Sequence, residues 1–314
     1  MRILVYGAGG IGGFFGGLLA RGGEDVWFVA RGSHLEAMKL AGLRMKSTMG
    51  NFTIPAGRMA DRPEAAGPVD VVFMCVKTYD TQEASRLLDP VLKRETIIIT
   101  FQNGIDNDEQ IRRVIRRGEV SGGVANVSAR ITAPGEVTET GGLQRLVFGP
   151  MDGKEDARYE ELGRRCVSAG INAVLSKEMR KELWRKFVFI TSMGSFTAVS
   201  RLTQGEILKH PESLDTVLSA MHEAVKVAQA VGVNMEEVNK EKSIESWRRF
   251  NPETRSSMYF DLIHDRPLEV ESLNGTLIRL AEAHRIDVPT HRLFYSVLAP
   301  HHRRNVEMRK RAPL

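Results

Sequence analysis

The segment from Gly7 to Gly12 limits the fold of this 314-residue chain more than any other feature. It reads Gly-Ala-Gly-Gly-Ile-Gly, follows the strand-like stretch Ile3–Gly7 and precedes the helix-like stretch Phe14–Arg21. In such a unit the first glycine permits a tight turn, the second lets a pyrophosphate approach the backbone, and the third lets the helix pack on the strand. Unpaired N–H groups at the helix start attract the anion. The sequence therefore predicts a dinucleotide-binding turn with four cofactor-binding glycines: Gly7, Gly9, Gly10 and Gly12.

Short apolar runs alternate with helical patterns through the first half of the chain, which is typical of parallel strands joined by crossover helices. The Pro134-Gly135 pair predicts a turn of the kind found at an antiparallel edge, so we expect a mixed sheet. The strongest predicted strands are 3–7, 25–30, 70–76 and 96–101, and the weaker ones are 121–129, 136–139, 143–149 and 172–175.

The second half has the period of helices from about residue 178, with no convincing strand. Four segments are long enough to be helices: 180–200, 213–231, 269–284 and 290–304. A chain of this length commonly folds as two domains. We therefore predict an α/β Rossmann-like domain over residues 1–177, doubly wound with a mixed sheet, followed by an all-α domain over residues 178–314.

Composition argues against several classes of protein. The two cysteines, Cys75 and Cys166, and the eight scattered histidines show no spacing typical of a metal site, so we expect no metal. The net charge is +5, but acidic and basic residues are interspersed, which favours a mixed solvated surface over nucleic-acid binding. No run of about 18 apolar residues occurs, and the chain starts with a strand-like segment rather than a signal core. We expect a cytoplasmic protein with no membrane contact.

The residues that follow the predicted strands point to the cofactor. The second strand is followed by Arg31, where an NAD site usually has Asp or Glu, and a guanidinium pairs with the 2′-phosphate of NADP. NADPH/NADP+ is therefore the predicted cofactor, although Arg31 also fits a plain surface charge. Lys77 and Asn103 follow the third and fourth strands, at the sheet edge where dinucleotides bind. Asn103 precedes Gly104, so a simple turn is the alternative there.

Two residues of the helical half are candidates for chemistry. Hydride addition to a ketone leaves negative charge on oxygen, and Lys186 is a candidate proton donor within a strongly apolar segment. Lys186, Ile190 and Gly194 recur at intervals of four and share one helical face. The alternative is a lysine that extends to solvent. Glu269 leaves a similar choice, because a glutamate at a helix start also interacts favourably with the helix dipole.

The glycine-rich turn 7–12, Lys77, Asn103, Lys186 and Glu269 lie in separated motifs that occur in one order along nearly the whole chain. By these motifs the chain resembles the ketopantoate reductase (2-dehydropantoate 2-reductase) family. The resemblance implies NADPH-dependent reduction of the 2-keto group of 2-dehydropantoate to give pantoate, in pantothenate biosynthesis. It also matches Arg31 and Lys77 to the family's contacts with the 2′-phosphate side of NADPH. The motifs that carry it are 7–12, Val76-Lys77, Gln102-Asn103-Gly104, Leu183-Trp184-Arg185-Lys186, Phe196-Thr197-Ala198, Gly205-Glu206, Ser256-Ser257-Met258 with Asp261, Glu269 with Asn274-Gly275, and Ile286-Asp287-Val288-Pro289.

The resemblance implies a role for each matched residue of the site. Lys186 matches the catalytic lysine, which polarises the keto oxygen and protonates it as hydride arrives. Glu269 matches the glutamate that binds the substrate hydroxyl and helps to hold the lysine. Ser257 matches a serine that hydrogen-bonds the substrate, and Asn103 matches the asparagine near the nicotinamide and the substrate.

The chain departs from the family pattern in the expected substrate pocket. Ile190 and Gly194 stand where two asparagines usually follow the lysine, Gln204 replaces a third, and Thr254 replaces a substrate-contacting one. Fewer amide donors weaken recognition of a small polar hydroxy-keto acid. An alternative substrate is therefore a bulkier or more apolar 2-keto acid, or an imine.

A second alternative is a non-catalytic NADP(H)-binding module, because a fold and a cofactor do not by themselves imply chemistry. Retention of both Lys186 and Glu269 favours catalysis. The partner we expect is a small 2-keto acid, and the assembly we consider is a homodimer.

Overall fold

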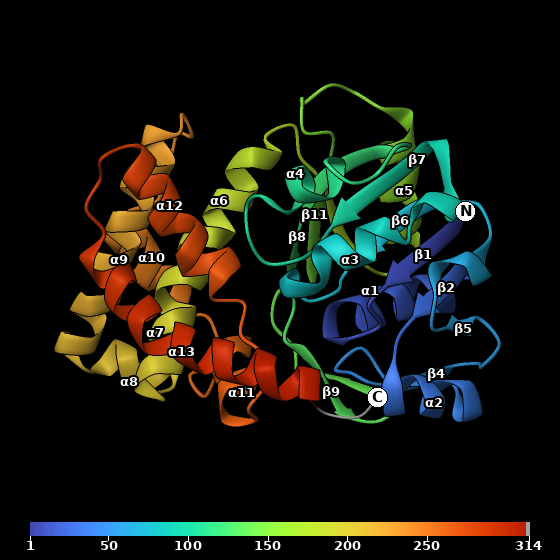
Figure 1. Ribbon diagram of the computed structural model, residues 1–314, viewed down its shortest axis with the longest axis horizontal. Coiled ribbons are helices and arrows are strands. Elements are labelled where there is room, and N and C mark those ends of the chain that lie inside the picture. The colour runs from blue at the N-terminus through green and yellow to red at the C-terminus, as the bar shows by residue number, and fades with distance from the viewer. Residues whose placement is uncertain (312–314) are drawn as a thin grey trace. The chain divides into compact units, whose positions relative to one another are not determined.

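The computed structural model describes residues 1–311, which form two compact units (Figure 1). The first unit contains Met1–Gln102 and Asp106–Glu182. The second contains Asn103–Ile105 and the described residues from Leu183 onward. A short segment after the fourth predicted strand therefore belongs with the helical half.

A mixed sheet of eight strands forms the centre of the first unit, as expected from the sequence. Neighbouring strands are parallel except for one antiparallel pair, β8 with β11. β1 lies between β6 and β2, so the carboxyl ends of these three strands lie at one edge of the sheet. The order is β12 (Asn172–Leu175), β11 (Arg145–Phe148), β8 (Glu119–Asn126), β7 (Leu92–Thr100), β6 (Val69–Met74), β1 (Arg2–Tyr6), β2 (Asp25–Val29) and β5 (Met59–Ala60).

A second sheet of four strands corrects one prediction. Residues 121–129 were expected to form a single strand, but the chain leaves β8 at Asn126 and starts β9 in the other sheet. Between them, the carbonyl of Ser128 accepts a hydrogen bond from the Thr140 amide, which turns the chain. The hairpin expected at Pro134-Gly135 is confirmed. The order is β4 (Phe52–Ile54), β3 (Leu43–Lys46), β10 (Glu136–Glu139) and β9 (Ala129–Ala133).

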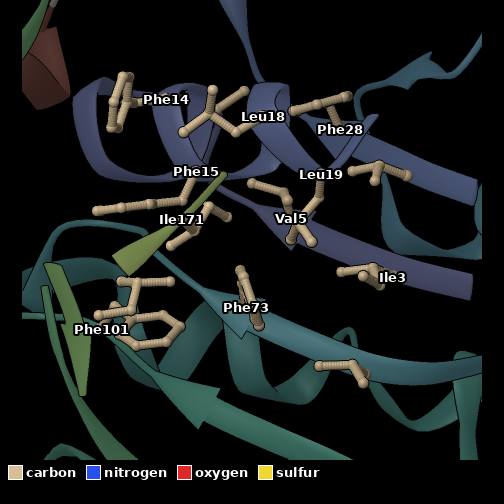
Figure 2. Close-up of a cluster of buried hydrophobic side chains, with 14 of the residues drawn as sticks. Ile3, Val5, Phe14, Phe15, Leu18, Leu19, Phe28, Phe73, Phe101 and Ile171 are labelled. Atoms are coloured by element: carbon tan, nitrogen blue, oxygen red, sulfur yellow. The ribbon is translucent and has the colours of Figure 1, made fainter. Parts of the chain in front are cut away.

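Apolar side chains cover both faces of the large sheet, because successive residues of a strand point to opposite faces. Ile3 and Val5 of β1 join one buried cluster, and Leu4 and Tyr6 join the other. Figure 2 shows the first cluster, in which Val5 lies below the α1 side chains. The helices of this unit are α1 (Gly10–Arg21), α2 (Gly32–Ala41), α3 (Thr81–Arg86), α4 (Asn107–Arg112) and α5 (Ala157–Ser168).

The described residues of the second unit form helices joined by loops, with no strand among them. Two of its predicted helices, 180–200 and 269–284, each contain a π-helical turn, at Ile190–Gly194 and at Glu271–Gly275. Within residues 1–311, no helix combines the length and the apolar character that crossing a membrane requires. The helices are α6 (Met179–Phe189), which continues from the first unit, α7 (Ser195–Ser200), α8 (Gln204–Lys209), α9 (Pro211–Ala230), α10 (Lys240–Trp247), α11 (Ser257–Ile263), α12 (Thr276–Ala283) and α13 (Pro289–Arg311).

Candidate active site

The glycines of the turn after β1 are required by close contacts. Gly7 has a φ of +102°, and a Cβ there would lie 2.7 Å from the Cys75 backbone. A Cβ at Gly12 would lie 2.2 Å from the Gly7 carbonyl oxygen, so only glycine lets α1 pack this closely on β1. A Cβ at Gly10 would lie 2.1 Å from the Ala129 carbonyl oxygen of β9, a contact that the sequence did not predict. Close contacts within the protein thus explain why three of the four positions carry glycine.

Gly9 differs from the other three because a Cβ there would meet nothing within 4 Å. It is the N-cap residue of α1, no side chain caps the helix, and the first turn carries no acidic residue. An open approach to an uncapped helix start is what a pyrophosphate needs. The turn therefore fits a dinucleotide, with Gly9 on the side that a ligand approaches.

His34 of α2 supports this turn and was missed in the sequence. Its Nδ1 accepts a hydrogen bond from the Gly135 amide at 3.0 Å, so Nε2 carries the proton and donates to the Ala8 carbonyl oxygen at 2.9 Å. Burial lowers the pKa of His34, which favours this neutral ring. The histidine ties the glycine-rich turn to the β9–β10 hairpin.

Arg31 lies directly after β2 but is already paired. Its Nη2 lies 2.7 Å from Oδ2 of Asp80, which ends the short turn Thr78–Asp80 after β6. The Arg31 side chain is 69% exposed and that of Asp80 is 14% exposed. Lys77, half-buried, precedes the same turn. The expected cations therefore lie at the sheet edge, together with a carboxylate that the sequence analysis did not identify.

The second unit brings Asn103 and Glu269 together. Glu269 is only 7% exposed, between fully buried Leu268 and Val270, and its Oε2 accepts a hydrogen bond of 3.1 Å from the Asn103 side-chain amide. A buried carboxylate costs free energy unless such partners are present. Its position is therefore not that of a solvated helix-start charge.

Lys186 lies half-buried in the last turn of α6, between an exposed Arg185 and a buried Phe187. The π-helical turn starts four residues later, at Ile190. A Cβ at Gly194 would lie 3.8 Å from the Ile190 Cβ, so these two positions are neighbours, as the spacing predicted. The helix between them is π-helical rather than α-helical.

Ser257 and its neighbour Ser256 lie at the start of α11. Ser257 is the first helical residue and is exposed. Ser256 caps the helix by accepting from the Tyr259 amide, and its hydroxyl donates to the Gly194 carbonyl oxygen at 2.7 Å. Ser256 therefore fixes the start of α11 beside Gly194, and Ser257 follows it directly in the chain.

A buried hydrogen-bond network joins the two π-helical turns. The Asn274 amide donates to the Thr191 carbonyl oxygen at 3.4 Å, and its Oδ1 accepts from the Ser195 hydroxyl at 2.9 Å. The same amide lies 3.2 Å from Nδ1 of His291. Asn274, Ser195 and His291 are fully buried. The network holds the segment that follows Lys186 against the segment that follows Glu269.

Among residues 1–311, no group of three or more His, Cys, Asp or Glu side chains is arranged to hold an ion. The first unit contains the glycine-rich turn, and the second unit contains a lysine and a buried glutamate.

Comparison with known families identifies this arrangement. The ketopantoate reductase PanE/ApbA family matches residues 3–153, and the C-terminal part of the same family matches residues 178–302. Together these matches span most of the chain and both of its units. The protein is an oxidoreductase. It belongs to the ketopantoate reductase family.

Relatives match over nearly their whole lengths. The 2-dehydropantoate 2-reductase of Archaeoglobus fulgidus is 29% identical over 95% of this chain and 96% of its own length. An uncharacterized oxidoreductase of Bacillus subtilis is 28% identical over 95% of this chain and 98% of its own length. The crystal structure of the Geobacter metallireducens 2-dehydropantoate 2-reductase superposes with a TM-score of 0.89, at 28% identity over 96% of this chain and 99% of that chain.

The same fold also occurs in an enzyme with a different name. D-mandelate dehydrogenase, solved with NADH and anilino(oxo)acetate, has a TM-score of 0.87 at 21% identity, over 97% of this chain and 99% of that chain. Membership of the fold therefore does not fix the substrate.

Proposed function

We propose that this protein reduces the keto group of a 2-keto acid with a nicotinamide cofactor, and that its substrate is 2-dehydropantoate, reduced to pantoate. The observation that carries the proposal is the hydrogen bond from half-buried Asn103 to buried Glu269 in the unit that also holds Lys186. A carboxylate held by an amide serves to bind and orient a substrate hydroxyl. We propose residues 1–177 as the cofactor domain and 178–314 as the substrate domain.

In the proposed mechanism each side chain has one task. Lys186 donates a hydrogen bond to the keto oxygen and then its proton, which stabilises the charge that develops there. Glu269 accepts a hydrogen bond from the substrate hydroxyl, Asn103 holds Glu269 in place, and Ser257 donates to the substrate. The bound cofactor supplies hydride to the keto carbon.

The residues of the first unit fit such a cofactor. The open face at Gly9 and the uncapped start of α1 would hold the pyrophosphate, while Gly7, Gly10 and Gly12 keep the turn close to the sheet. Arg31 and Lys77 would lie on the 2′-phosphate side, so NADPH is the proposed hydride donor.

A second candidate substrate is a bulkier or more apolar 2-keto acid. At the neighbouring positions 190 and 194, Ile190 has an apolar side chain and Gly194 has none, where family members usually have amide donors. A polar hydroxy-keto acid would leave a hydrogen bond unmade at this face.

The test is NADPH oxidation at 340 nm by the purified protein with a panel of 2-keto acids. The panel contains 2-dehydropantoate, 2-ketoisovalerate and phenylpyruvate. The proposal predicts 2-dehydropantoate turnover within about 1–1000 per second. Faster turnover of 2-ketoisovalerate, which is more apolar, or of phenylpyruvate, which is bulkier and more apolar, would favour the second candidate. Tight NADPH binding without turnover of any panel member would favour a non-catalytic module.

A further inference from the structure

The pair of Arg31 and Asp80 links two strands of the large sheet. Arg31 follows β2, and Asp80 follows β6, while β1 with its glycine-rich turn lies between them. The distance of 2.7 Å between Arg31 Nη2 and Asp80 Oδ2 is that of a charge-assisted hydrogen bond. The guanidinium at this edge therefore already has an anionic partner before any ligand arrives.

The surroundings of the pair are more acidic than the sequence indicated. Burial raises the pKa of the Tyr6 hydroxyl, at the end of β1, to about 12, and the negative charges of Glu64 and Glu83 act in the same direction. Asp80 adds to this effect, and Arg31 opposes it. Three carboxylates thus act on the Tyr6 hydroxyl, together with the Arg31 guanidinium.

NAD sites commonly use a carboxylate at the end of the second strand, which accepts hydrogen bonds from the adenosine ribose and repels a 2′-phosphate. This chain has Arg31 at that point, but the turn that follows β6 supplies a carboxylate, that of Asp80, instead. We infer that Asp80 is a cofactor-specificity residue that occupies Arg31 and reduces the preference for NADPH over NADH.

The inference rests on the proposed function, because it assumes that a nicotinamide dinucleotide binds at the glycine-rich turn. A 2′-phosphate must displace Asp80 from Arg31, or bind beside its negative charge. A 2′-hydroxyl carries no charge and donates to a carboxylate. Asp80 therefore opposes the first ligand and accommodates the second, which reduces the difference in affinity between NADPH and NADH.

The experiment measures binding rather than turnover. Adenosine 2′,5′-bisphosphate and AMP carry the adenosine half of each cofactor without nicotinamide, and their affinities are measured by calorimetry for wild type and for Asp80→Asn. The wild type should bind the two ligands within about tenfold of each other, and Asp80→Asn should raise the ratio in favour of the bisphosphate by about tenfold or more, as expected for one charge-assisted contact. The ratio of the affinities for NADPH and NADH should change in the same direction in Asp80→Asn.

Two further variants distinguish a specific effect of Asp80 on the affinity ratio from a general effect of losing a surface ion pair. Asp89→Asn removes the carboxylate from another surface pair, with Arg116, and should leave the ratio unchanged. In an Arg31→Ala background, Asp80→Asn should change the ratio far less, because the two residues act on each other. Tight fragment binding with an unchanged ratio in Asp80→Asn would overturn this inference alone. Failure of the wild type to bind any of the four ligands would overturn both this inference and the proposed function.

Discussion

The side-chain amide of Asn103 donates a hydrogen bond of 3.1 Å to Glu269, a residue 166 positions further along the chain. Asn103 follows the last residues of β7 in sequence, yet it belongs to the compact helical unit with Glu269. The turn that follows β7 thereby helps to satisfy a buried carboxylate of the proposed substrate site.

Removal of this amide tests its contribution. Asn103→Ala leaves a buried carboxylate with one donor fewer, so we expect a loss of about 1–3 kcal/mol in the free energy of unfolding of the helical unit. We also expect a higher KM for the keto acid. Urea unfolding and steady-state kinetics measure these effects. Gln229→Ala, which removes an exposed side-chain amide of α9 in the same unit, is the matched control. Equal stability of the two variants would contradict the contribution of this hydrogen bond.

Two glycines of the turn should respond differently to the same substitution. Gly9→Ala places a Cβ where nothing lies within 4 Å, so the melting temperature should stay within a few degrees, while dinucleotide affinity should fall about tenfold or more. Gly12→Ala places a Cβ 2.2 Å from the Gly7 carbonyl oxygen and should destabilise the first unit by about 1–3 kcal/mol. Thermal unfolding and fluorescence titration with NADPH distinguish the two. Unchanged affinity in Gly9→Ala would place the ligand elsewhere.

The buried His291 predicts a loss of stability in acid. Burial lowers the pKa of its ring to about 4, and its Nε2 lies 2.8 Å from the Ala220 carbonyl oxygen. The unfolded chain binds the proton near pH 6.5, so the stabilising contribution is complete above that pH and is lost as the pH falls toward 4. Between pH 7 and pH 5 we expect a loss of roughly 2 kcal/mol.

Urea unfolding at several pH values measures this dependence, with His291→Gln as the comparison. The variant is less stable at pH 7 but should show a shallower fall between pH 7 and pH 5. The same slope in both proteins would mean that other groups cause the acid sensitivity.

The face formed by Ile190 and Gly194 should control which keto acid is accepted. A Cβ at Gly194 would lie 3.6 Å from the Ser256 Cβ, an ordinary contact, so the double variant Ile190→Asn/Gly194→Asn should fold. Restored amide donors should lower the KM for 2-dehydropantoate about tenfold and raise it for phenylpyruvate. Steady-state kinetics with both acids provide the measurement. If both KM values move together, these positions do not set specificity.

Much of the fold was predictable because its signals are local. The glycine-rich turn between β1 and α1, the hairpin at Pro134-Gly135 and the change to helical periodicity near residue 178 each depend on a few adjacent residues. The separate four-stranded sheet was not predictable, since it pairs β3 with β10, about ninety residues apart. Its strands are short, and β3 alternates buried with exposed side chains over only four residues.

The π-helical turns could not be predicted from the sequence either, because their stability depends on hydrogen bonds to residues far away in the chain. The carbonyl of Thr191 in the first turn accepts a hydrogen bond from Asn274 in the second. Similarly, Arg31 was visible as a cation after β2, but its partner Asp80 follows another strand. Sequence patterns identified individual candidate residues, whereas the pairs that they form required the tertiary structure.

The most direct test of the account is the turnover of Lys186→Ala. Lys226→Ala, at an exposed position of α9, is the matched control, and NADPH affinity is measured for both variants by fluorescence titration. We predict that Lys186→Ala keeps its NADPH affinity and loses about 100- to 10,000-fold in kcat for keto acid reduction, while Lys226→Ala resembles wild type. Unchanged kcat in Lys186→Ala would contradict the central claim that this lysine protonates the keto oxygen.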